Sequence, residues 1–101
     1  MSNDAVYPSL KNKVVLVTGG ASGIGESITR AMIKQGAKVG FLDFDEEAAT
    51  KLLNELGTDN ISSQICDLRD IDQLKNSVQE VSKTLGAIDV LVNNAARDDR
   101  H

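Results

Sequence analysis

The sequence predicts an α/β fold in which a mostly parallel sheet carries helices on both faces, and three observations support this. Short apolar segments alternate with longer amphipathic segments between Val14 and Asn93. The apolar segments are largely continuous rather than alternating with polar residues, as in strands that are buried on both faces. The segments between them have the length of helical crossovers, which parallel strands require. All-α and all-β folds do not account for this order.

The predicted strands lie near residues 14–18, 38–43, 61–66 and 88–93. Each is short, rich in Val, Ile or Leu, and followed by a turn or a polar cluster. We therefore expect about four strands with three helices, in one small domain that comprises residues 1–101. With nothing beyond it, the fourth strand would be an open, apolar sheet edge.

Three helices are predicted from apolar residues at helical spacing and from residues that favour helix ends. Asp45 and Asp70 are the predicted N-caps of the second and third helices. Gly36, Gly57 and Gly86 follow the three helices as stop signals. The apolar positions expected to face inward are Ile24, Ile28, Ala31 and Met32 in the first helix, Leu52, Leu53 and Leu56 in the second, and Ile71, Leu74, Val78, Val81 and Leu85 in the third.

Composition excludes several classes of function. The formal net charge is −4 and the charges are not gathered in blocks, which argues against a nucleic acid or an anionic membrane as the main partner. The single cysteine, Cys66, excludes an internal disulfide and is expected to be a buried strand residue. No apolar run long enough to span a membrane occurs and the N-terminal residues lack an apolar signal segment, so a cytoplasmic location is expected.

A glycine-rich turn, TGGASGIG, joins the first predicted strand to the first helix, at Thr18–Gly25. Free N–H groups and the positive end of the helix dipole make such a turn suited to phosphate, and glycines let a phosphate approach the backbone. A P-loop is excluded because Glu26 stands where that motif needs lysine. The spacing G-x-G-x-x-G is absent as well. The alternative is a turn whose glycines serve only the close packing of strand and helix.

The pattern present, T-G-x-x-x-G-x-G with Thr18, Gly19, Gly23 and Gly25 in its defined places, resembles the short-chain dehydrogenase/reductase family. The resemblance implies a Rossmann-type doubly wound parallel sheet, of which this chain is the N-terminal part, with a nicotinamide cofactor over the turn. The turn residues expected to contact that cofactor are Gly19, Ser22, Gly23, Ile24 and Gly25.

Asp43 ends the second predicted strand, 18 residues after Gly25. At this end of a doubly wound sheet a carboxylate can accept hydrogen bonds from both ribose hydroxyls of adenosine, whereas a 2′-phosphate would meet like charge. Relatives that prefer the phosphate carry a basic residue at positions that Ser22 and Phe44 occupy here. NAD is therefore expected rather than NADP. The alternative role for Asp43, a helix cap, suits Asp45 better.

The resemblance extends to the ends of the third and fourth predicted strands. It implies that Asp67 bonds the adenine amino group, assisted by the backbone of Leu68, although an ordinary turn aspartate is the alternative. The family sequence N-N-A-G corresponds to NNAA here, in which Asn94 and Ala95 are expected to lie against the cofactor. Ala96 replaces the family glycine, which would strain or shift this turn.

The family's catalytic Ser and Tyr-x-x-x-Lys pair belong beyond the fourth strand, and this sequence has no counterpart there. Its one tyrosine, Tyr7, precedes Lys11 at the same spacing but lies before the first strand, with Pro8 between them. We interpret that match as coincidence and expect no catalytic residue and no metal ligand.

The expected function is the N-terminal, cofactor-binding part of an NAD-dependent short-chain oxidoreductase that acts on an alcohol or carbonyl substrate. VYPSLKNK near the start and NNA-x-x-DDRH at the end resemble a subgroup that oxidises a sugar at C1. The whole enzyme would be a homo-oligomer, a tetramer or a dimer, and Asn93 to His101 would be the point where it is cut. The alternatives are a non-catalytic module that binds NAD or an adenine nucleotide, and a truncated product that does not fold stably.

Overall fold

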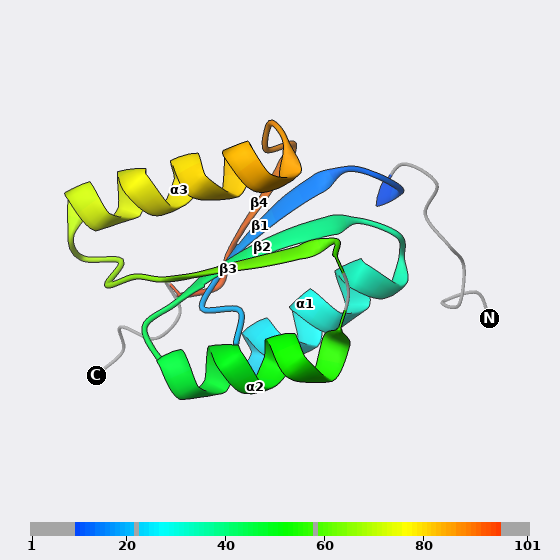
Figure 1. The fold of residues 1–101 in the computed structure, drawn as a ribbon, viewed down its shortest axis with the longest axis horizontal. Coiled ribbons are helices and arrows are strands. Elements are labelled where there is room, and N and C mark those ends of the chain that lie inside the picture. Colours follow the sequence, from blue (N-terminus) through cyan, green and yellow to red (C-terminus); the bar gives the residue numbers. More distant parts are fainter. Residues whose placement is uncertain (1–9, 22, 58, 96–101) are drawn as a thin grey trace.

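Strands and helices alternate through residues 10–21, 23–57 and 59–95, which the computed structural model describes (Figure 1). The α/β prediction is confirmed. None of the helices in these ranges is both long and apolar enough to cross a membrane. In chain order the elements are β1 (Val14–Thr18), α1 (Gly23–Lys34), β2 (Lys38–Asp43), α2 (Glu46–Leu56), β3 (Ile61–Ile65), α3 (Ile71–Leu85) and β4 (Val90–Asn93).

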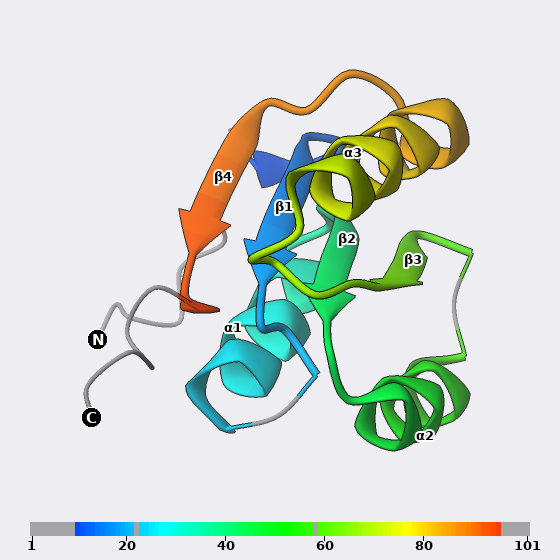
Figure 2. The same cartoon turned by 90° about the vertical axis from the view of Figure 1, so that its left-hand side faces the viewer.

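The four strands form one parallel sheet in the order β3-β2-β1-β4, so the first strand lies inside the sheet (Figure 2). Val15 of β1 pairs with Val39 of β2 on one side and with Val90 of β4 on the other. Since all strands run in one direction, their carboxyl ends meet at one edge of the sheet. The strand order reverses between β1 and β4, which makes that edge the expected position of a ligand.

Each face of the sheet has its own apolar core. Side chains alternate along β1, so Val15 and Val17 pack in the core with α1 and α2, whereas Val14 and Leu16 pack with α3. Figure 1 shows α3 on one side of the sheet and the other two helices on the opposite side. Burial on both faces explains why β1 is a continuous apolar run.

Two strand boundaries differ from the prediction. The third strand ends at Ile65 rather than Cys66, because its pairing partner β2 ends at Asp43, whose carbonyl accepts the N–H of Cys66. The fourth strand begins at Val90 rather than Ile88. Ahead of it, Asp89 binds Val14 twice, since its carboxylate accepts the Val14 N–H and its own N–H donates to the Val14 carbonyl.

The predicted N-caps are confirmed, but three predicted core residues are not. Asp45 accepts the N–H of Ala48, and Asp70 accepts those of the first turn of α3. Ile24 and Ile71 are 61% and 58% exposed, and Ala31 is exposed as well. Ile24 and Ile71 lie in the first turn of a helix; Ile24 lines a cavity at the sheet edge, and the start of α3 extends past the end of β3 (Figure 1). Ala31 lies two positions after Thr29, which is buried, and therefore on the opposite side of α1.

Gly40 lets α3 lie close to the middle of β2. A Cβ at this position would be 2.4 Å from Cγ1 of Val81, a fully buried residue of α3. Gly40 does not have a positive φ angle, so its backbone conformation does not require glycine. The close contact with α3 does.

We expect Gly40→Ala to destabilise the chain by about 1–3 kcal/mol, because the added methyl overpacks the core. Chemical denaturation followed by circular dichroism measures this. The double variant with Val81→Ala should lose less stability than the sum of the two single variants, since the second change removes the colliding methyl groups. Strictly additive losses would contradict the proposed contact.

Candidate functional site

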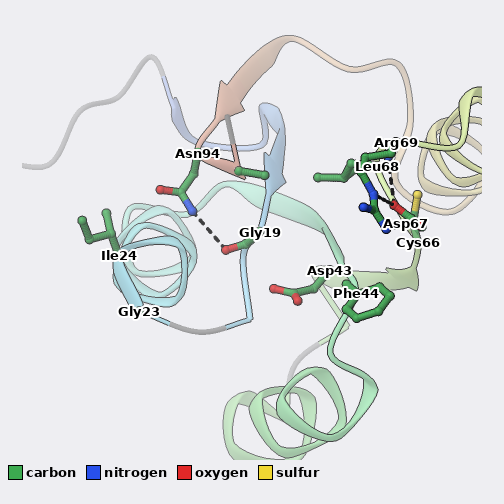
Figure 3. A pocket seen from close by; sticks show the side chains of 11 residues that line it. Gly19, Gly23, Ile24, Asp43, Phe44, Cys66, Asp67, Leu68, Arg69 and Asn94 are labelled. Carbon is green, nitrogen blue, oxygen red and sulfur yellow. Dashed lines mark hydrogen bonds and ion pairs between the residues drawn. The ribbon is translucent and has the colours of Figure 1, made fainter. Parts of the chain in front are cut away.

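A cavity of about 600 Å³ opens at the carboxyl ends of the strands, where the strand order reverses (Figure 3). It is bounded by the glycine turn after β1, the end of β2, the loop after β3 and the end of β4. Its lining residues are Gly19, Gly23, Ile24, Asp43, Phe44, Cys66, Asp67, Leu68, Arg69, Asn94 and Ala95.

The glycines of the turn serve two different purposes. A Cβ on Gly25 would lie 1.7 Å from the carbonyl oxygen of Gly19, so only glycine lets α1 begin so close to the turn. Gly23 has a φ of 58°, and a Cβ there would meet nothing within 4 Å. This side of the turn is therefore open to the cavity at the N-terminus of a helix, an arrangement that fits an anionic group such as a phosphate.

The end of β4 is tied to the turn by hydrogen bonds. Nδ2 of Asn94 donates to the Gly19 carbonyl at 3.2 Å, as Figure 3 shows. The N–H of Ala95 donates to Oγ1 of Thr18 at 3.1 Å, and that hydroxyl donates to Oδ1 of Asn93 at 3.0 Å. Asn94 thus shapes the glycine turn, and the Ala95 N–H already has a partner.

Asp43 connects the glycine turn to the start of α2. It is 8% exposed, and its Oδ2 accepts the N–H of Ala21 while Oδ1 accepts the N–H of Asp45, both at 2.9 Å. Asp45, not Asp43, caps α2. Each Asp43 oxygen therefore keeps acceptor capacity beyond its one protein partner, and the carboxylate points into the cavity (Figure 3).

The loop after β3 brings a second carboxylate to the cavity. Asp67 forms an ion pair with Arg69, whose Nε lies 3.1 Å from Oδ1. Hydrogen bonds from the Arg69 side chain, and then from its backbone, hold the pKa of the Asp67 carboxyl below its usual 3.8. Asp67 is therefore ionised at neutral pH. Cys66, which precedes it, is buried, as expected.

Nine of the residues predicted to contact a cofactor line this one cavity: Gly19, Gly23, Ile24, Asp43, Phe44, Asp67, Leu68, Asn94 and Ala95. Gly25 does not line it and instead lies buried in α1 beneath the turn. Ser22, Tyr7 and Ala96 lie outside the described residues. The prediction omitted Cys66 and Arg69, although their positions beside Asp67 at the end of a strand were visible in the sequence.

The family model for short chain dehydrogenases matches residues 13–101, so the chain belongs to the short chain dehydrogenase family. It is 45% identical to D-xylose 1-dehydrogenase of Caulobacter vibrioides over 101 residues, which cover 98% of this chain and 39% of that protein. It is 39% identical to the probable galactose dehydrogenase of Rhizobium meliloti, covering 93% of this chain and 38% of that one. The chain thus spans well under half the length of these relatives.

Solved structures agree with this assignment. The 3-ketoacyl-(acyl-carrier-protein) reductase of Brucella melitensis complexed with NADH matches with a TM-score of 0.77 and 30% identity, covering 81% of this chain and 34% of that one. Actinorhodin polyketide ketoreductase with NADPH matches with a TM-score of 0.76 and 38% identity, covering 81% and 32%. The fold is Rossmann-like, and the family consists of oxidoreductases that act on CH–OH groups and use nicotinamide cofactors.

We expect Gly25→Ala to destabilise the chain by more than about 3 kcal/mol, because the methyl collides with the backbone of the turn. Gly23→Ala is the matched control, since it costs only the left-handed conformation, about 1–2 kcal/mol. Denaturation curves give the loss of stability for each variant, and NMR spectra of the amide groups report changes around Gly19 and Asn94. Equal losses for the two variants would contradict the close approach of α1 to Gly19.

Proposed function

We propose that this chain is the cofactor-binding part of an NAD-dependent oxidoreductase, which transfers a hydride between NAD and an alcohol or carbonyl substrate. The observation that carries the proposal is the Asp43 carboxylate, which faces the cavity across from the glycine turn. A phosphate-binding turn beside a fixed carboxylate matches the pyrophosphate and the adenosine ribose of a dinucleotide.

Each wall of the cavity is proposed to contact one part of the dinucleotide. Gly19, Gly23 and Ile24 would surround the pyrophosphate, with Gly25 acting only by allowing the close packing of α1. The Asp43 carboxylate would accept the ribose hydroxyls. The adenine would lie between Phe44 and the loop of Asp67 and Leu68, because these residues line the cavity beyond Asp43. Asn94 and Ala95 would lie against the part of the cofactor that leads to the nicotinamide.

The charges around the cavity favour NAD over NADP. A 2′-phosphate on the ribose would meet the Asp43 carboxylate, and Phe44, which follows it, is uncharged and 74% exposed. Among the described residues, Arg69 is the only cationic side chain that lines the cavity, and Asp67 already neutralises it. No free cation in this part of the chain therefore offsets the repulsion of a phosphate.

The substrate is proposed to be a small alcohol, and in the narrower form of the proposal a sugar oxidised at C1. Support comes from the names of the relatives, a D-xylose 1-dehydrogenase and a probable galactose dehydrogenase. The sequence contains no Tyr-x-x-x-Lys after the fourth strand, so these 101 residues are expected to be inactive alone. The active enzyme is proposed to be a cytoplasmic homo-oligomer, a tetramer or a dimer, with neither nucleic acid nor membrane as partner.

One alternative follows from that lack of catalytic residues, namely a module that binds NAD or an adenine nucleotide without reaction. A second alternative is a product that does not fold stably. Calorimetric titration of the purified chain with NAD, together with thermal unfolding, separates them. Saturable binding with a cooperative melt but no turnover supports the module, whereas neither binding nor melt supports the unstable product.

We expect Asp43→Ala to weaken NAD binding at least about tenfold, because two charge-assisted hydrogen bonds to the ribose are lost. NADP binding should change far less, since the repulsion of its phosphate is removed at the same time. Isothermal titration with both dinucleotides measures the ratio of the two affinities. The ratio is the informative quantity, because Asp43 also holds the turn through Ala21.

Asp45→Ala is the control for this experiment. It removes the same charge two positions away and costs about 1 kcal/mol through the lost cap of α2, with no effect on the ratio. An Asp43→Ala variant that discriminates between NAD and NADP as the unmodified chain does would refute the ribose assignment.

A further inference from the structure

The loop after β3 holds one carboxylate in a fixed orientation. Oδ1 of Asp67 accepts the backbone N–H of Arg69 at 3.0 Å and its Nε at 3.1 Å, while Oδ2 accepts Nη2 at 3.1 Å. The planar guanidinium thus binds both carboxylate oxygens at once, which restricts the rotation of the aspartate side chain. One residue separates the two partners in the chain, so the pair forms within the loop itself.

The backbone of Asp67 is fixed as well. Its N–H donates to Oε1 of Gln73 at 3.0 Å and its carbonyl accepts the N–H of Asp70 at 2.9 Å, which attaches it to the first turn of α3. Nε2 of Gln73 in turn donates to Oδ2 of Asp70 at 3.2 Å. The preceding Cys66 donates its N–H to the carbonyl of Asp43 at 2.9 Å. The main freedom left to Asp67 is therefore the rotation of its side chain.

We propose that Arg69 is a positioning residue, which holds the Asp67 carboxylate as a fixed hydrogen-bond acceptor and thereby makes the cavity prefer a purine with an amino group over one with an oxo group. This inference rests on the proposed function, because the purine is the adenine of the dinucleotide. Oδ2 of Asp67 has one protein donor and keeps a lone pair for a ligand. An ionised carboxylate accepts hydrogen bonds but cannot donate one, so it pairs with an amino group and repels a carbonyl oxygen.

Two further observations support this role. The Arg69 side chain is 87% exposed and belongs to neither apolar core, so an exposed pair of this kind adds little to the stability of the fold. Both partners nevertheless line the cavity. The same hydrogen bonds lower the pKa of the Asp67 carboxyl. At neutral pH this carboxyl therefore has no proton to offer to an oxo group.

The test compares NAD with nicotinamide hypoxanthine dinucleotide, which carries an oxo group in place of the adenine amino group. Isothermal titration of the purified chain should show a preference for NAD. Arg69→Ala should weaken NAD binding by about 3- to 10-fold and leave the analogue unchanged, because a charge-assisted hydrogen bond is loosened rather than removed. Arg69→Lys keeps the charge but not the planar pair of donors, so its affinity for NAD should lie between those of the unmodified chain and Arg69→Ala. It serves as the second variant if the alanine substitution prevents folding.

Arg30→Ala is the matched control. Arg30 also forms ion pairs, with Glu26 and Glu55, but it does not line this cavity. Its removal should leave the preference for NAD unchanged. Because both alanine variants lose one positive charge, the comparison separates the positioning role of Arg69 from the effect of net charge. The inference is overturned if the alanine variant at position 69 keeps the original preference, or loses affinity equally for both dinucleotides. An unmodified chain that binds neither dinucleotide would instead overturn the proposed function, and this inference with it.

Discussion

The close approach of α1 to the end of β1 is the constraint on which the cavity depends. The Cα of Gly25 lies against the Gly19 carbonyl, with no room for a side chain between them. Because the turn is held this tightly, the same carbonyl can accept Nδ2 of Asn94, and the N–H of Ala21 reaches the Asp43 carboxylate. One glycine contact thus allows hydrogen bonds to the ends of β2 and β4, the two strands that flank β1, and together they shape one wall of the cavity.

The apolar cores and the polar edge of the sheet have different roles in the fold. The cores position the strands, since β1 is buried on both faces between α3 and the other two helices. The edge then places polar groups at the carboxyl ends of these strands. Asp43 and Asp67 stand on adjacent strand ends, linked through the N–H of Cys66. A ligand that crosses the cavity would meet a helix N-terminus first and carboxylates beyond it, as the polarity of a dinucleotide requires.

Local features were predictable because their causes are local. Asp45 and Asp70 cap helices by bonding N–H groups two or three residues away, and such spacing is visible in a sequence. Ile24 and Ile71 were assigned wrongly to the core, because helical periodicity does not reveal where a helix extends past the sheet. Arg69 was omitted from the site for a different reason. Its relevance depends on its pairing with Asp67, and the spacing of two residues in a loop does not specify that side-chain conformation.

The sequence by itself determined the alternation of strands and helices, the glycine turn and most of the residues at the strand ends, because these follow from periodicity, capping and short-range backbone geometry. Only the tertiary structure decided that Gly25 lies beneath the turn rather than in the cavity, that Asn94 bonds Gly19, and that Asp67 is paired. The first depends on how the turn brings the start of α1 against Gly19, and the second on a contact between segments 75 residues apart in the chain. The third depends on a side-chain conformation, which no spacing rule specifies.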